Sequence, residues 1–439
     1  MSAPNTTLRR DVGLFGATLM GLGSILGTGA FVSIGIAAGI TGPSVVLATV
    51  LAALVATCNA LNSAQLAAAH PVSGGAYEYG YRLLTPALGF TAGWMFLCAK
   101  AASAATAALG FSGYALEAMG VNLSGVHTGV ALVAVFLLSM LTVGGIRRSN
   151  GTNTIIVSIT MGALGVFVLA LLPTALSQGT DNLFPFFGVG TGEHGAPLPA
   201  FLEATALMFV AFTGYGRIAT LGEEVHDPRR TIPRAIVATL TLSATIYIGL
   251  ALVAVAAAGA AMLGNETDAT SATLEQVARK LSSPAVAWVV GLGAVTAMLG
   301  VLLNLILGLS RVLFAMARRH DAPFVFSRVS ERSGTPNGAI WGVGAVIAAL
   351  TLVGDVKTTW SFSAFTVLIY YAINNMAALR LPPEDRLYSP LWAWGGLASC
   401  LFLAFWVDRW IWAAGLGLIV VGLLARALSH AISGGPANK

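Results

Sequence analysis

The sequence predicts an all-α polytopic membrane protein, and three observations support that fold class. Hydrophobic residues make up 56% of the 439 residues and charged residues only 9%, whereas about a quarter of the residues of a soluble domain are charged. The mean hydropathy is +0.81. Apolar runs of roughly 20 residues or more recur along the chain, which suits helices and exceeds the length of membrane-barrel strands.

Twelve apolar stretches are predicted to span the membrane within a single domain, residues 1–439. Their approximate limits are 12–39, 43–69, 86–119, 128–146, 152–176, 199–222, 233–261, 284–317, 338–354, 359–380, 390–406 and 409–428. An even number of spans places both termini on one side of the membrane. With that side as the cytoplasm, 17 of the 23 lysines and arginines lie inside. The positive-inside rule therefore predicts cytoplasmic N- and C-termini in the plasma (inner) membrane.

The first span is predicted to be a broken helix. Residues 21–32 read Gly-Leu-Gly-Ser-Ile-Leu-Gly-Thr-Gly-Ala-Phe-Val, with four glycines in nine residues. A glycine inside a helix costs about 0.5–1 kcal/mol relative to alanine, so the cluster marks a place where the backbone leaves the helix. Broken membrane helices are typical of transporter binding sites, because their free N–H and C=O groups can hold a zwitterion. Close helix packing through small residues is the alternative.

The third span contains a lysine at mid-membrane, Lys100. It lies 14 residues after Pro86 and 19 residues before Met119, so its side chain is too short to reach either interface. Ionisable residues at this depth mark ion pathways, substrate sites or proton relays. A structural lysine, satisfied by helix carbonyls or hydroxyls, is the alternative.

The sixth span is predicted to contain a second break, because Gly214 and Gly216 lie in its middle. Spans 1 and 6 each open a block of five, as expected for two inverted repeats at about 12–176 and 199–380, followed by two extra helices at about 390–428. This second break weakens the packing alternative for the first span.

Charged residues follow the second break. Arg217, Glu223 and Glu224 precede a run of arginines that begins at Arg229. We predict that these residues form an inner gate whose ion pairs change with the state of the protein. For Arg217, a structural pair with a carboxylate or with carbonyls near the gate is the alternative.

Three sets of residues resemble the amino acid, polyamine and organocation (APC) transporter superfamily. They are Gly27-Thr-Gly-Ala-Phe31; Phe209-Val-Ala-Phe-Thr-Gly-Tyr215 with Glu223-Glu-Val and Pro228-Arg-Arg-Thr-Ile-Pro233; and Arg311-Val-Leu-Phe-Ala-Met-Ala317 with Gly334-Thr-Pro-Asn337. Each set is loose alone, but their order and spacing over spans 1–9 are specific. The resemblance implies twelve helices in the five-plus-five inverted-repeat fold shared with sodium-coupled leucine transporters.

The resemblance also implies a substrate site. In similar transporters the α-carboxylate binds N–H groups of the first break, and the α-amine binds carbonyls of both breaks. The matching residues here are Ile25, Gly27, Thr28, Gly29, Val210, Ala211, Thr213 and Gly214.

Two positions depart from the family pattern. Val210 stands where relatives often have an aromatic gate, which suggests a roomier or differently gated pocket. Thr160 stands where many proton-coupled or proton-insensitive relatives have a lysine, so the family's coupling rule does not transfer. We hypothesise that Lys100 replaces that lysine by exchanging a proton, or else pairs with the side-chain carboxylate of an acidic amino acid.

The sequence thus predicts a permease that moves amino acids by alternating access, with proton coupling, symport and exchange left open. A polyamine or amine transporter or exchanger is the main rival, and a transporter-like receptor is another. We expect no enzyme, because no nucleophile–base or metal constellation lies at membrane depth. The expected partners are a small-molecule substrate, the lipid bilayer and, as an option, protons. We expect no cofactor, nucleic acid or metal. A disulfide-linked heavy subunit is not expected either, since all three cysteines lie in apolar spans.

Overall fold

The computed structural model describes residues 12–71, 74–121, 126–145, 150–187, 196–219, 225–270, 272–330 and 334–432. This part of the chain is helical, and its only β-bridge is an isolated pair between Val12 and Val225. The all-α fold class is therefore confirmed.

The helices follow one another with short connections. In chain order they are α1 (Leu14–Ile25), η1 (Gly29–Ser33), α2 (Ile34–Thr41), η2 (Gly42–Ser44), α3 (Val45–Ala69), α4 (Ala76–Leu83), α5 (Pro86–Ala118), α6 (Val126–Val143), α7 (Asn150–Leu183), α8 (Pro197–Phe212), η3 (Thr213–Tyr215), α9 (Gly216–Ala219), α10 (Pro228–Ala258), α11 (Ala260–Thr270), α12 (Thr273–Leu281), α13 (Pro284–Arg318), η4 (Phe324–Ser327), α14 (Asn337–Val353), α15 (Val356–Leu379), η5 (Pro383–Asp385), α16 (Pro390–Ala404) and α17 (Arg409–Ile432).

Nine helical segments in the described residues are long and apolar enough to cross a membrane. Three shorter apolar helices, α1, α14 and α16, have 10–17 residues. Every predicted span falls on one or more of these helices. The count of twelve crossings and the inverted repeat stay predictions.

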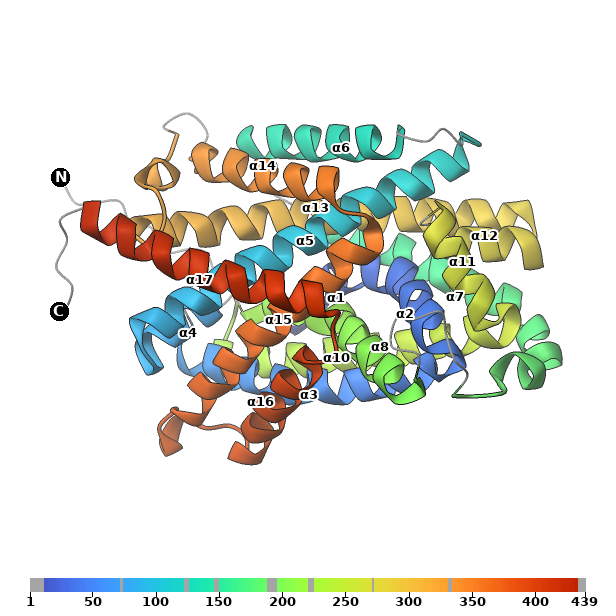
Figure 1. Cartoon of the computed structure of the whole chain (residues 1–439), viewed down its shortest axis with the longest axis horizontal. Coiled ribbons are helices and arrows are strands. Elements are labelled where there is room, and N and C mark those ends of the chain that lie inside the picture. The colour runs from blue at the N-terminus through green and yellow to red at the C-terminus, as the bar shows by residue number, and fades with distance from the viewer. Residues whose placement is uncertain are drawn as a thin grey trace.

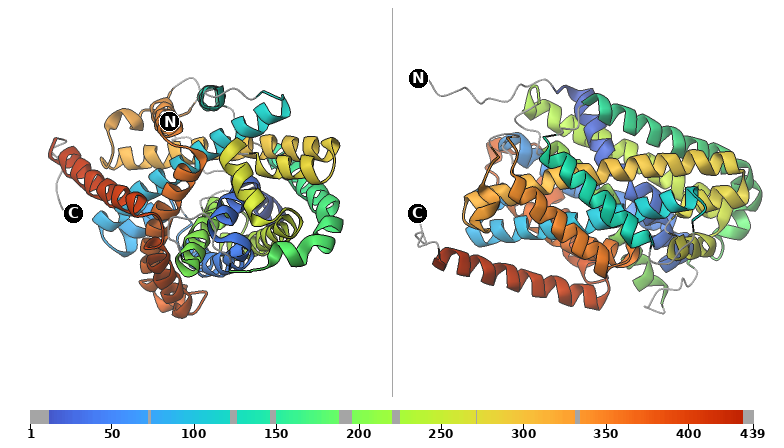
Figure 2. Two further views of the ribbon diagram at one scale, coloured as in Figure 1. Left: turned by 45° about the vertical axis from the view of Figure 1, so that its right-hand side comes forward. Right: turned by 90° about the horizontal axis from the view of Figure 1, so that it is seen from above.

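The helices differ in how deeply they are buried. Helices α5, α8 and α15 are among the most buried, whereas α6 and α17 bury little of their surface. Figures 1 and 2 show α6 and α17 on the periphery of the bundle. Helix α17 contacts α5 and α15 there.

Two apolar helices are interrupted at the glycine clusters. Helix α1 ends at Ile25, and the chain resumes as a π-helical turn, η1, that leads directly into α2. Helix α8 ends at Phe212, and a 3₁₀ turn, η3, separates it from the short α9. We call residues 26–29 the first break and residues 213–215 the second break.

A buried carboxylate holds the C-terminal part of the last helix, α17, against the bundle. Asp321, which follows α13, accepts hydrogen bonds from Arg426 Nε of α17 and from the Tyr77 hydroxyl of α4, both at 2.8 Å. The Tyr81 hydroxyl donates to the same carboxylate. Because the donors come from α4 and α17, Asp321 ties these two helices to the end of α13, and the Arg426 cation compensates its charge.

Candidate functional site

Each break packs against the end of the other interrupted helix. A Cβ atom added to Gly214 would lie 2.5 Å from the Ser24 carbonyl oxygen and 2.6 Å from Ile25 Cγ1. A Cβ atom added to Gly29 would lie 2.9 Å from Cβ of Ala211. Real side chains do not approach so closely, so glycine at both positions allows the two interrupted helices to meet.

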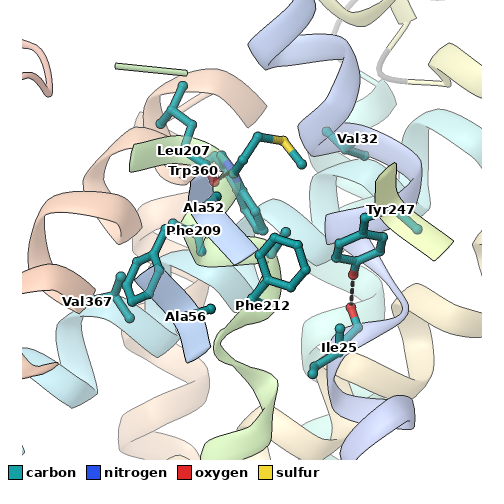
Figure 3. Packing of buried hydrophobic residues seen from close by; sticks show 14 of the residues in the cluster. Ile25, Val32, Ala52, Ala56, Leu207, Phe209, Phe212, Tyr247, Trp360 and Val367 are labelled. Atoms are coloured by element: carbon teal, nitrogen blue, oxygen red, sulfur yellow. Dashed lines mark hydrogen bonds between the residues drawn. The ribbon is translucent and has the colours of Figure 1, made fainter. Parts of the chain in front are cut away.

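Polar side chains from neighbouring helices hold the first interrupted helix. The Tyr247 hydroxyl of α10 donates to the Ile25 carbonyl at 2.7 Å, as Figure 3 shows. The Asn153 amide of α7 donates to the Leu19 carbonyl at 2.7 Å. A carbonyl oxygen has two lone pairs, so the Ile25 carbonyl can accept a further hydrogen bond.

A cavity lies where the breaks meet. Its volume is about 160 Å³ and part of it is open to solvent, which is enough room for a small molecule. Its walls come from the end of α1, the first break, Gly74 before α4, and α5, α8, η3, α9, α13 and α15. Nine residues predicted from the sequence line it: Ile25, Thr28, Gly29, Lys100, Val210, Ala211, Thr213, Gly214 and Arg217.

Lys100 reaches the second break. Its side chain is 8% exposed, and Nζ donates to Thr213 Oγ1 at 2.8 Å, with the Thr213 carbonyl at 3.5 Å. The Thr213 hydroxyl in turn donates to the Val210 carbonyl at 2.8 Å. This chain of hydrogen bonds connects α5 to the interrupted helix, and it places the amine at the cavity wall.

The other predicted residues lie elsewhere. Gly27 is not among the cavity-lining residues, and a Cβ atom there would lie 2.5 Å from Val301 Cγ2. Thr160 is buried in α7, where its hydroxyl donates to the Ile156 carbonyl at 2.8 Å, and it does not line the cavity. Glu223 and Glu224 lie outside the described residues.

Several lining residues were not predicted. Trp360 of α15 closes one wall, and its indole N–H donates to the Leu207 carbonyl at 3.1 Å. Arg311 of α13 is exposed and also lines the cavity. Asn153 and Tyr247, which hold the first interrupted helix without lining the cavity, were not predicted either. The sequence alone does not show which of them faces the breaks.

Known proteins resemble the chain over nearly its full length. The profile of the family described as amino acid permease matches residues 16–429. An uncharacterized transporter of Mycobacterium tuberculosis is 39% identical, over 97% of this chain and 92% of its own. A branched-chain amino acid permease and a methylthioribose transporter, both of Bacillus subtilis, are 28% and 26% identical, each over 96% of this chain and 94% of its own.

Proposed function

Because the chain belongs to the amino acid permease family, and is therefore a multi-pass membrane transporter, we propose that it is a secondary active transporter of amino acids. The observation that carries the proposal is the meeting of two interrupted helices at one cavity. Interrupted helices supply backbone N–H and C=O groups inside a membrane, where a zwitterion can use both. A cavity bordered by such breaks suits the head group shared by all amino acids.

The proposed pose follows from the polarity of the breaks. The α-carboxylate lies at Thr28 and Gly29, where the helix resumes and its N-terminal dipole favours an anion. Thr28 Oγ1 is buried, lines the cavity, and has no hydrogen-bond partner among the described residues. The α-amine lies near the carbonyls of Ile25 and Ala211 beside the two breaks.

We propose that transport proceeds by alternating access in a fold of two inverted repeats. The repeats would comprise α1 to α7 and α8 to α15, with α16 and α17 as the two extra helices. The cavity extends along α13 from Val301 to Ala315, toward the Arg318 end. With the termini in the cytoplasm of a plasma-membrane protein, that end is cytoplasmic, and the structure is an inward-facing state.

Thermal stabilisation of the purified full-length protein in detergent tests the substrate class. The panel contains the twenty amino acids, the amines agmatine, putrescine and ethanolamine, which lack an α-carboxylate, and methylthioribose, at two pH values. A ligand at a hundred times its Kd adds about 2.7 kcal/mol to the free energy of unfolding, which shifts the melting temperature measurably. We expect stabilisation by amino acids and none by the decarboxylated amines.

Other outcomes would contradict the proposal. Stabilisation by amines alone would contradict the proposed carboxylate site at Thr28 and Gly29 and would favour an amine transporter. Stabilisation by methylthioribose alone would favour a sugar-like substrate. Binding of amino acids without uptake into proteoliposomes would favour a receptor.

A further inference from the structure

We propose that the cavity selects amino acids with an acidic side chain, and that Lys100 binds the side-chain carboxylate. The inference rests on the proposed amino acid transport and specifies its substrate class. It is carried by the position of one buried cation and by the charges around the cavity.

Lys100 lacks a counter-charge in the described part of the protein. Its hydrogen-bond partners there, the hydroxyl and carbonyl of Thr213, are both neutral. The side chain is nevertheless buried, near the middle of a 33-residue helix. An ammonium group in this position loses hydration that neutral partners replace only in part. A ligand carboxylate in the cavity that Lys100 lines would offset this loss.

Lys100 also lies beside the carbonyls of the second break, which a cationic side chain of the substrate would need. In the substrate site that the family resemblance implies, carbonyls of both breaks accept hydrogen bonds from the substrate amine. Here Nζ of Lys100 already lies 3.5 Å from the Thr213 carbonyl oxygen, and the Thr213 hydroxyl already donates to one lone pair of the Val210 carbonyl. The substrate amine therefore binds near the carbonyls of Ile25 and Ala211, and a cationic side chain beside Lys100 would be repelled.

The remaining charges on the cavity wall have the same sign. The charged side chains that line it, among the described residues, are Lys100, Arg217 and Arg311. Arg217 makes a further interaction of its own, so Lys100 and the exposed Arg311 are the cations that a ligand in the cavity meets. A cavity with low-dielectric walls concentrates the field of such charges, and this field attracts anions. The cavity thus favours a substrate with two carboxylates and one amine, whose net charge is negative.

Binding constants of the purified full-length protein test the inference. Glutamate, aspartate, glutamine, asparagine and lysine are titrated against the wild-type protein, Lys100→Met, and the control Lys357→Met, which removes an exposed lysine that does not line the cavity. We expect the wild-type protein to bind glutamate at least roughly 10-fold more tightly than glutamine. Lys100→Met should weaken glutamate binding by roughly 10- to 100-fold and change glutamine binding by less than about threefold. Lys357→Met should change neither.

The wild-type measurement alone can overturn the inference, even if Lys100→Met does not fold. Equal or tighter binding of glutamine would contradict acidic selectivity and leave amino acid transport standing, whereas failure of every amino acid to bind would remove both proposals. Equal losses of glutamate and glutamine in Lys100→Met would assign the lysine a structural role. An unchanged glutamate preference in that variant, with loss of pH-dependent uptake, would assign it to proton exchange. Either result would contradict the proposal that Lys100 binds the side-chain carboxylate of the substrate.

Discussion

Two glycines of the interrupted sixth span have very different surroundings. At Gly214 an added Cβ atom would meet backbone atoms of Ser24, the carbonyl oxygen at 2.5 Å and the carbonyl carbon at 2.6 Å. At Gly216 the nearest atom to an added Cβ would be the Tyr371 hydroxyl oxygen, at 3.7 Å. The first position therefore has no room for a methyl group, and the second does.

This difference predicts opposite outcomes for two otherwise matched substitutions. Gly214→Ala should separate the two breaks, lower the free energy of unfolding by about 1–3 kcal/mol and abolish ligand binding. Gly216→Ala should retain both stability and binding. Thermal unfolding with and without ligand measures both effects, and a Gly214→Ala variant that binds like the wild-type protein would show that the breaks do not depend on this contact.

Glu275 is a buried carboxyl group on α12, outside the membrane-spanning helices. Its Oε1 atom accepts a hydrogen bond from Arg279 Nη2 at 2.7 Å, while Oε2 has no partner among the described residues. Burial raises the pKa of Glu275 from 4.5 to about 7, because it outweighs the opposing effect of Arg279, and the Glu117 carboxylate raises it further. The folded protein therefore keeps a proton on Glu275 that the unfolded chain releases.

The raised pKa predicts that stability falls with increasing pH. The contribution of Glu275 is fully present below about pH 4.5 and is lost as the pH rises through about 7. It is on the order of 1–3 kcal/mol. The melting temperature of Glu275→Gln should fall less between pH 5 and 8 than that of the wild-type protein. Glu384→Gln, at an exposed position, is the control, and a wild-type pH slope in Glu275→Gln would contradict the prediction.

At the scale of elements, one tyrosine connects the first interrupted helix to α12. The Tyr114 hydroxyl of α5 donates to the Phe31 carbonyl of η1 at 2.9 Å and accepts the Leu274 N–H of α12 at 3.2 Å. Both partners are backbone groups in a buried setting. Tyr114 thereby fixes α12 against the helix that resumes after the first break.

Removal of this hydroxyl should loosen the contact between the two elements. Tyr114→Phe leaves a buried carbonyl and a buried N–H without their partner, which costs about 1–3 kcal/mol of unfolding free energy. Tyr79→Phe is the matched control, because the Tyr79 hydroxyl is buried and has no partner in the described part of the chain. Thermal unfolding should show a lowered melting temperature for Tyr114→Phe alone. Equal melting temperatures for the two variants would contradict the bridging role.

At the scale of the whole molecule, the proposed topology places the two ends of each long helix on opposite sides of the membrane. Lys357 lies at the start of α15 and Arg328 in the connection between α13 and α14, and both are exposed. In the proposed orientation Lys357 is outside and Arg328 is cytoplasmic.

Cysteine labelling in intact cells checks this orientation. A membrane-impermeant maleimide should label Lys357→Cys and leave Arg328→Cys unlabelled until the membrane is permeabilised. The variants are compared with the wild-type protein, whose Cys58, Cys98 and Cys400 are buried or half-buried. The reverse labelling pattern would invert the topology and make the cavity outward-facing.

The sequence by itself determined the fold class, the family and the places where two apolar helices are interrupted. These properties are local, because the length of an apolar run and the density of glycines are read along the chain without knowledge of its neighbours. The depth of Lys100 is local in the same sense, since it depends only on distance along one helix. The resemblance then placed most of the cavity-lining residues of both breaks.

Only the tertiary structure decided which side chains meet. It placed Lys100 on Thr213, left Thr160 within its own helix and brought Tyr247 to the first break. The physical reason is that helices which are apolar on nearly every side have no distinct polar face, so the helical period does not reveal which residue points to which neighbour. Packing between helices far apart in the sequence sets those directions. Gly214, for example, lies so close to the backbone of Ser24 that no side chain would fit there.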